Sequence, residues 1–136
     1  MFESSLLEKL KSDGELVKLV STYENSPSIF CLTAPEKVPN PYITFTITKY
    51  GVDAGVDRFN IFVDIWDYGM SAAVVNAISK RTEFILDQKI LQHADYDTIR
   101  ISRESAGIVP ETDVKEIHLN MQFSARAGRK AWAQQL

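Results

Sequence analysis

The sequence is poor in the residues that most often build disulfides, metal sites and phosphate-binding loops. Its 136 residues include one cysteine, two histidines and six glycines. The single cysteine, Cys31, excludes an internal disulfide and is typical of a reducing compartment. Because Cys31 lies in a short apolar run, 29–32, we expect its thiol to be buried and inert.

Long hydrophobic runs are missing as well. No apolar run approaches the roughly 20 residues that a membrane-spanning helix needs. Residues 1–8 lack the basic start and the apolar centre of a secretion signal. We therefore expect no membrane partner.

Catalytic and metal-binding motifs are also absent from the sequence. No serine lies in a G-x-S-x-G context, and neither H-x-x-x-H nor C-x-x-C spacing occurs. His118 lies on the polar side of a predicted strand, where a solvated or hydrogen-bonded role is expected rather than a ligand role. The sequence therefore predicts no enzyme activity, no cofactor and no metal site.

Charge of one sign is not concentrated in this chain. Fifteen basic and eighteen acidic residues give a net charge of −3 and a pI near 5.4. Affinity for DNA comes largely from basic groups that neutralise phosphates. The composition therefore argues against a protein whose main task is to grip nucleic acid, although local basic patches remain.

What the sequence does contain is a pair of strongly patterned strands, 42–49 and 58–67. In the first, Ile43, Phe45 and Ile47 alternate with threonines, and the second alternates in the same way. This period of two is typical of a strand with one buried face. The connector 50–57 is longer than a tight turn needs and holds two glycines, so we expect a mobile loop and a contact surface.

The remaining patterns predict helices and further strands around this pair. Residues 3–22 show helical spacing, either as two short helices or as one kinked helix, with capping boxes at Ser5 and Ser12. The sequence predicts an α+β fold: an antiparallel four-stranded sheet in ββαββ order, an N-terminal helix, and one long helix packed on the sheet. In this prediction the long helix spans about 70–91, and the third and fourth strands span 97–103 and 114–125 with a loop at 104–113 between them. An edge strand at 29–32 precedes the first strong strand.

We expect residues 1–125 to form a single domain, followed by a basic C-terminal tail, 126–136, that is disordered in the monomer. Basic side chains on the third strand and in this tail are either solvated or line a surface for DNA or an acidic partner. Trp66 either anchors an interface or packs on the second face of the sheet. The candidate interface residues are Tyr50, Val52, Asp53, Val56, Asp57, Trp66, Arg100, Arg103, Arg126, Arg129, Lys130 and Trp132.

Several short motifs together resemble a known family. They are Asn40-Pro41-Tyr42-Ile43-Thr44-Phe45, then Val63-Asp64-Ile65-Trp66-Asp67, then an Ala/Val/Ile-rich helix, and a last strand that alternates toward Phe123. This order is similar to the tail-completion proteins of long-tailed bacteriophages, which include tail terminators and tail-to-head joining proteins. The resemblance covers roughly residues 3–125, and the segment from Arg126 onward has no counterpart in it.

The resemblance implies a structural role without catalysis or cofactor. Members assemble into a ring, often a hexamer, that caps the tail tube and joins it to head connector proteins. DNA contacts such a ring only in passage, and the protein moves from the host bacterial cytoplasm into the virion. Two alternatives stay open: a head-side connector or stopper ring, and a small ligand-binding or regulatory α+β domain.

Overall fold

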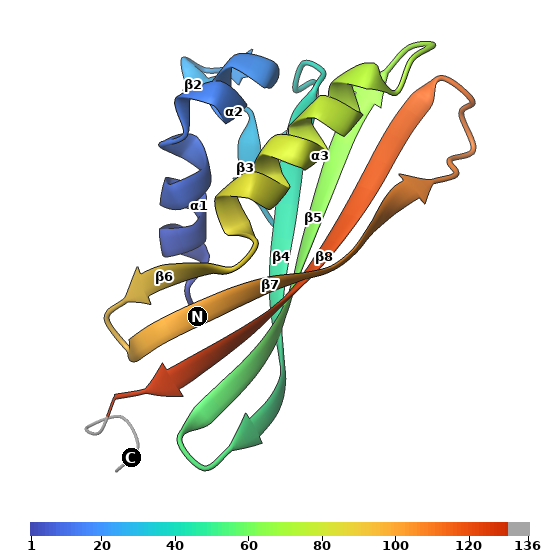
Figure 1. Ribbon diagram of the computed structural model, residues 1–136. Coiled ribbons are helices and arrows are strands. Elements are labelled where there is room, and N and C mark those ends of the chain that lie inside the picture. Colours follow the sequence, from blue (N-terminus) through green and yellow to red (C-terminus); the bar gives the residue numbers. More distant parts are fainter. Residues whose placement is uncertain (131–136) are drawn as a thin grey trace.

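A computed structural model describes residues 1–130 of the chain, so the predicted interface residue Trp132 lies outside the described residues. One mixed sheet of six strands, in the order β3-β4-β5-β8-β7-β6, forms the body of the fold (Figure 1). Its strands are β3 (Ile29–Cys31), β4 (Tyr42–Asp53), β5 (Val56–Tyr68), β6 (Lys89–His93), β7 (Tyr96–Val109) and β8 (Glu116–Arg129).

The α+β class and the four central antiparallel strands are confirmed, but the predicted number of strands is wrong. β3 pairs in parallel with β4, and β6 pairs with β7, which brings the sheet to six strands. β3 matches the edge strand predicted at 29–32, whereas β6, an edge strand of five residues, carries too little alternation to be recognised from the sequence. Cys31 ends β3 and is exposed, contrary to prediction.

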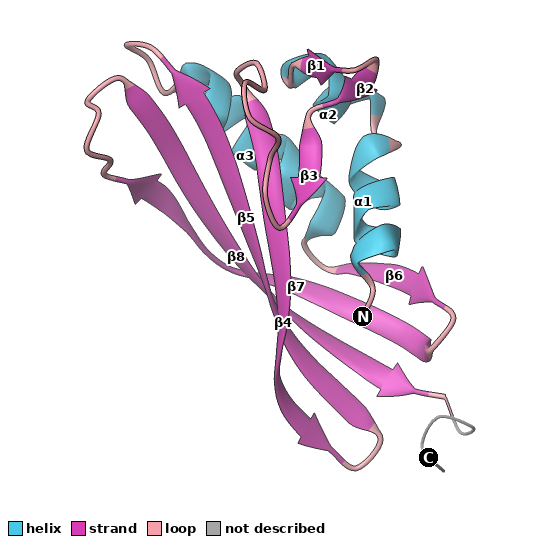
Figure 2. Cartoon of the chain, turned by 180° about the vertical axis from the view of Figure 1, so that it is seen from behind, coloured by secondary structure: helices cyan, strands magenta, loops and turns pink. Residues whose placement is uncertain are grey.

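Within residues 1–130, three helices cover one face of the sheet and leave the other face open (Figures 1 and 2). They are α1 (Glu3–Lys11), α2 (Gly14–Leu19) and α3 (Ala73–Leu86), and a separate two-stranded ribbon joins β1 (Thr22–Tyr23) to β2 (Ser26–Pro27). The alternating apolar residues of β4 and β5 face these helices, so Ile43, Phe45 and Ile61 are fully buried. No helix within residues 1–130 is long and apolar enough to cross a membrane.

The N-terminal helical region consists of two helices, which resolves the alternatives left by its sequence. Neither predicted capping box forms: Phe2 is the N-cap of α1, and Asp13 is the N-cap of α2. The Asp13 carboxylate accepts a hydrogen bond from the Leu16 amide at 2.8 Å and two from the Arg81 guanidinium at 2.9 and 2.8 Å. The paired hydrogen bonds from Arg81 connect α2 to α3, and they hold the pKa of Asp13 below its usual value.

Helix α3 is shorter than the predicted helix at 70–91. It begins after Ala72, whose neighbour Ser71 accepts a hydrogen bond from the Ala73 amide through its hydroxyl. The helix ends at Leu86 because Asp87 is extended and Gln88 adopts a left-handed conformation with φ of 59°. The chain then reverses into β6, whose first three residues lie within the range predicted as helix.

The predicted loop at 50–57 is wrong, because β4 and β5 continue through it to a tight turn. Their pairing runs from Tyr42 opposite Trp66 to Asp53 opposite Val56, with a bulge at Tyr50. Gly55 has a φ of 77°, which the turn requires and which glycine adopts without strain. The hairpin tip projects beyond the helices, so its outer residues have no core to alternate against (Figure 1).

The last two strands also extend further than predicted. β7 continues to Val109 through most of the predicted loop at 104–113, and β8 continues beyond Ala125 to Arg129. Ala127 is fully buried against the sheet. Residues 126–129 therefore belong to β8 and not to the predicted C-terminal tail.

Candidate functional site

The open face of the sheet carries a stacked aromatic cluster at one end. The Trp66 indole lies between the His118 imidazole and the Tyr42 ring, with centroids 3.8 and 6.2 Å away and ring planes nearly parallel. Its Nε1 donates to the Thr44 hydroxyl at 3.3 Å. Trp66 therefore packs on the second face of the sheet, and its predicted role as an interface anchor stays a prediction.

His118 is held between two carboxylates. Its Nε2 lies 2.6 Å from Asp64 Oδ1, and its Nδ1 lies 2.7 Å from Glu111 Oε1. Asn120 also donates to Asp64 Oδ1 at 2.9 Å. Both ring nitrogens of His118 are therefore within hydrogen-bond distance of a carboxylate oxygen. The hydrogen-bonded role predicted for His118 is confirmed, and the contact fastens the loop that carries Glu111 to the sheet.

A row of three arginines crosses the other end of the open face. Arg126 on β8 lies opposite Arg58 on β5 and opposite Arg100 on β7. Arg58 donates to Asp53 Oδ2 at 3.2 and 3.0 Å, while Arg100 and Arg126 are exposed. Like charges directly opposite one another in a sheet are destabilising. This arginine row therefore places like charges side by side on the open face, an arrangement that costs the fold stability.

Replacing Arg126 with glutamine is expected to leave the fold intact and to raise the free energy of unfolding by about 0.5 kcal/mol, because it relieves repulsion on two sides. Chemical denaturation measures the change. Arg103→Gln is the matched control: Arg103 lies on β7 but pairs with Glu83 of α3 at 3.2 Å, so its loss should slightly destabilise the protein. Destabilisation by Arg126→Gln of more than about 1 kcal/mol would show that the row supports the fold.

On the helix side, a buried carboxylate lies close to the turn of the β4–β5 hairpin. Asp57 is 2% exposed and accepts a hydrogen bond from the Tyr96 hydroxyl at 3.2 Å. Lys49 Nζ lies 3.4 Å from Asp57 Oδ2, and Arg129 Nε lies 3.7 Å from Asp57 Oδ1. Asp57 and Arg129, both predicted as surface contacts, therefore meet in a charge cluster inside the fold.

The tip of the β4–β5 hairpin presents exposed side chains next to that cluster. Tyr50 and Val52 are 57% and 58% exposed, and Asp53 pairs with Arg58. Val56 is half-buried. The tip is thus a projecting, partly apolar surface on a paired hairpin rather than on a long loop.

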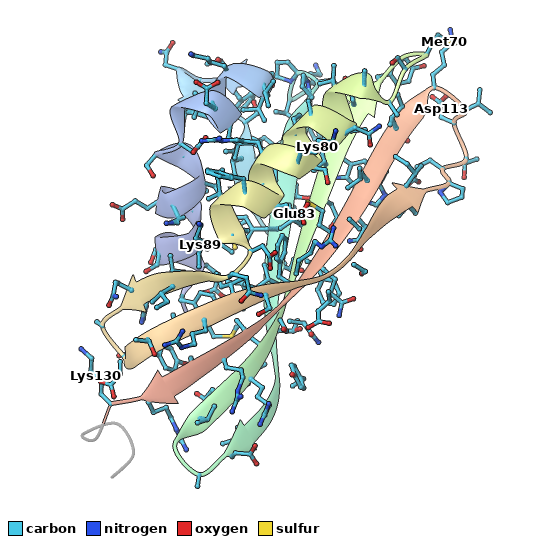
Figure 3. The ribbon with its side chains drawn as sticks, in the orientation of Figure 1. Met70, Lys80, Glu83, Lys89, Asp113 and Lys130 are labelled. Carbon is cyan, nitrogen blue, oxygen red and sulfur yellow. The ribbon has the colours of Figure 1, made fainter. Side chains whose placement is uncertain are left out.

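A second exposed apolar surface lies at the opposite end of the molecule. Met70 and Val114 are 91% and 92% exposed, and Ile108 is 53% exposed. With Pro110 they line a groove between the segment that precedes α3 and the β7–β8 loop. Figure 3 shows Met70 beside Asp113 at this end, far from Lys130 at the other. The molecule therefore has a partly apolar surface at each end.

The structure brings together only some of the residues singled out by sequence. Arg100 and Arg126 share the arginine row, whereas Arg103 pairs with α3 and Lys130 follows β8. Sequence reasoning missed Arg58, and only the register of β5 against β8 reveals it. Within residues 1–130, no group of His, Cys, Asp or Glu side chains could hold a metal ion.

This arrangement, three helices on one face of a strongly twisted mixed sheet, occurs in solved structures. One is a chain from the virion of a native gene transfer agent (GTA) particle, with a TM-score of 0.78, 14% identity, and 92% of each chain covered. Another solved chain gives a TM-score of 0.67 and 10% identity, with 95% of this chain and 92% of that chain covered. No protein-family model and no curated protein matches the sequence.

Proposed function

We propose that this protein is a structural component of a phage-like virion. The observation that carries the proposal is the shared fold with a chain of the gene transfer agent virion, over 92% of both chains. Support also comes from the surfaces described above, since exposed apolar surfaces at both ends suit a subunit that contacts partners on two sides.

Within such a particle, we propose a ring, most simply a hexamer, that caps the tail tube and joins it to the head connector proteins. The sequence resemblance to tail-completion proteins supports this finer role. The protein acts without catalysis or cofactor, assembles in the host bacterial cytoplasm, and then remains in the tail or neck of the virion. DNA contacts the ring only in passage.

Purified protein is expected to form closed rings, alone or when mixed with tail tubes of the same particle. Light scattering with size-exclusion chromatography gives the mass, and negative-stain imaging shows whether particles are ring-shaped and sit at tube ends. A mass of one subunit under all conditions, with bare tube ends, would contradict the proposal.

The same mixtures separate the tail side of the joint from the head side. Rings that bind tail tubes but not purified head connector or portal assemblies support the tail terminator role. Rings that bind only the head assemblies would instead identify a connector or stopper of the head. A melting temperature raised by a metabolite, in a protein that never forms rings, would indicate a ligand-binding domain.

A further inference from the structure

Two strands of the sheet are covered along only half of their outer edges. β6 pairs with β7 at residues 89–93 opposite 96–101, and β3 pairs with β4 only at 43–45. Within residues 1–130, no strand pairs with the outer side of β7 at 102–109 or of β4 at 46–53. Figure 2 shows these segments at opposite ends of the sheet. Each is therefore an available pairing edge.

The hydrogen-bonding pattern shows which backbone groups of β7 point outward. The Arg129 amide donates to the Gly55 carbonyl on the β5 side of β8. Backbone groups alternate in direction along a strand, so those of the even-numbered residues of β8 point toward β7. His118 and Asn120 are among those that face β7, and they lie opposite Val109 and Gly107. The remaining positions of this segment, Ala106 and Ile108, therefore direct their amides and carbonyls away from β8.

The same reasoning applies to β4. The Leu32 amide donates to the Phe45 carbonyl on the outer side, so the odd-numbered residues of this part of β4 face away from β5. Ile47 and Lys49 continue that series before the bulge at Tyr50. β4 thus presents a second short row of outward amides and carbonyls.

We infer that residues 46–49 of one copy pair in antiparallel fashion with residues 106–109 of the next copy. β4 and β7 run in opposite directions within the sheet, so copies in the same orientation meet with antiparallel strands. The two edges differ, so the contact is head-to-tail, and head-to-tail contacts form a ring when the rotation between copies closes. The inference deepens the ring proposed above and rests on it.

The chemistry of the β7 edge supports a strand partner. Natural proteins protect edges with lysine, proline or very short strands, and β6 carries Lys89 while β3 has three residues. The β7 segment from Ser105 to Ile108 has no such protection. A Cβ added at Gly107 would meet nothing within 4 Å, so packing inside the subunit does not require this glycine.

In one register of this pairing, residues on the helix side of one strand lie opposite residues on the helix side of the other, and the same holds for the open face. This register places Ile47 opposite Ile108 on the helix side and Thr48 opposite Gly107 on the open face. It also pairs the outward amides and carbonyls of Lys49 with those of Ala106. Ile108, 53% exposed in the subunit, becomes covered in the pair.

The first test replaces Ala106 with proline, which removes an outward amide while leaving the β7–β8 ladder intact. The apparent dissociation constant for self-association is expected to rise at least about tenfold, measured by light scattering across concentrations. Ala106→Val keeps the amide and is the matched control. Circular dichroism checks that both variants remain folded.

The second test places cysteines at the predicted neighbours in a Cys31→Ser background. Thr48→Cys with Gly107→Cys should give disulfide-linked ladders up to the ring size on non-reducing gels, because directly opposite positions lie close enough for a disulfide. The two positions lie on opposite edges of the sheet, so the bond forms only between copies. Each single substitution serves as a control.

The outcomes separate this inference from the ring itself. Wild-type rings that are unaffected by Ala106→Pro and yield no ladder would overturn the edge pairing and leave the proposed function standing. If Ala106→Pro weakens the rings but the cysteine pair yields no ladder, then a strand other than β4 pairs with β7, and the inferred partner is wrong. Wild-type protein that never associates would overturn both.

Discussion

Replacing Phe59 with alanine is expected to lower the free energy of unfolding by about 3 to 5 kcal/mol. Phe59 is fully buried on β5, and its ring meets Phe2 and Tyr96 edge-on at centroid distances of 5.0 and 6.1 Å. Removing it takes away buried apolar area and two aromatic contacts, and leaves a cavity between the N-terminal segment and the sheet.

Chemical denaturation measures this loss. Phe84→Ala is the control: Phe84 lies on α3 and is 62% exposed, with the Arg81 guanidinium 4.6 Å from its ring centroid. We expect that control to cost less than about 1 kcal/mol. Equal losses for the two variants would show that Phe59 does not anchor the core.

Replacing Asp57 with asparagine is expected to destabilise the fold by about 2 to 3 kcal/mol, because Lys49 and Arg129 lose their buried counter-charge. The loss is smaller than for a fully enclosed pair, since the side chains of Lys49 and Arg129 are 42% and 31% exposed and can turn toward water. Chemical denaturation of Asp57→Asn beside Asp53→Asn, which removes an exposed charge from the same hairpin, gives the comparison.

The same substitution should change the alkaline behaviour of Tyr96. Burial and then the negative charge of Asp57 raise the pKa of Tyr96 to about 12, above a usual value near 10. A raised pKa favours the neutral phenol in the fold, so this contribution to stability is complete below pH 10 and is lost as the pH rises through 12.

Asp57→Asn removes the charge but not the burial, so the pKa of Tyr96 should fall while staying above 10. Phenolate absorbance, taken as the difference from Tyr96→Phe to remove the other tyrosines, follows this titration. An unchanged Tyr96 titration in Asp57→Asn would show that burial alone raises the pKa.

The sequence predicted the central strands well because their buried faces alternate without interruption, as Ile61, Val63 and Ile65 do. It failed where the chain leaves the core. The hairpin beyond Lys49 and the end of β7 around Gly107 lie outside the helix layer, so backbone pairing holds them and their side chains carry no period. The end of α3 depends on a left-handed Gln88, a residue type that does not predict this conformation.

The candidate surfaces were predictable only in part. Arg100 and Arg126 stood out as basic residues, but their alignment with Arg58 depends on the register of three strands that are distant in the sequence. The sequence predicts Asp57 in a loop because the nearby glycines suggest mobility, whereas a tight turn at Gly55 places it in the sheet. Pairing between distant strands decides the first case, and the geometry of one tight turn decides the second.

The position of β8 sets the order in which this protein can be completed during synthesis. It is the last strand of the described chain, yet it lies in the centre of the sheet and pairs along its length with both β5 and β7. Until residues 116–129 have left the ribosome, β5 and β7 each lack their inner neighbour. Folding therefore waits for the end of this segment, and a nascent chain that stops before it has no complete sheet with which to join an assembly.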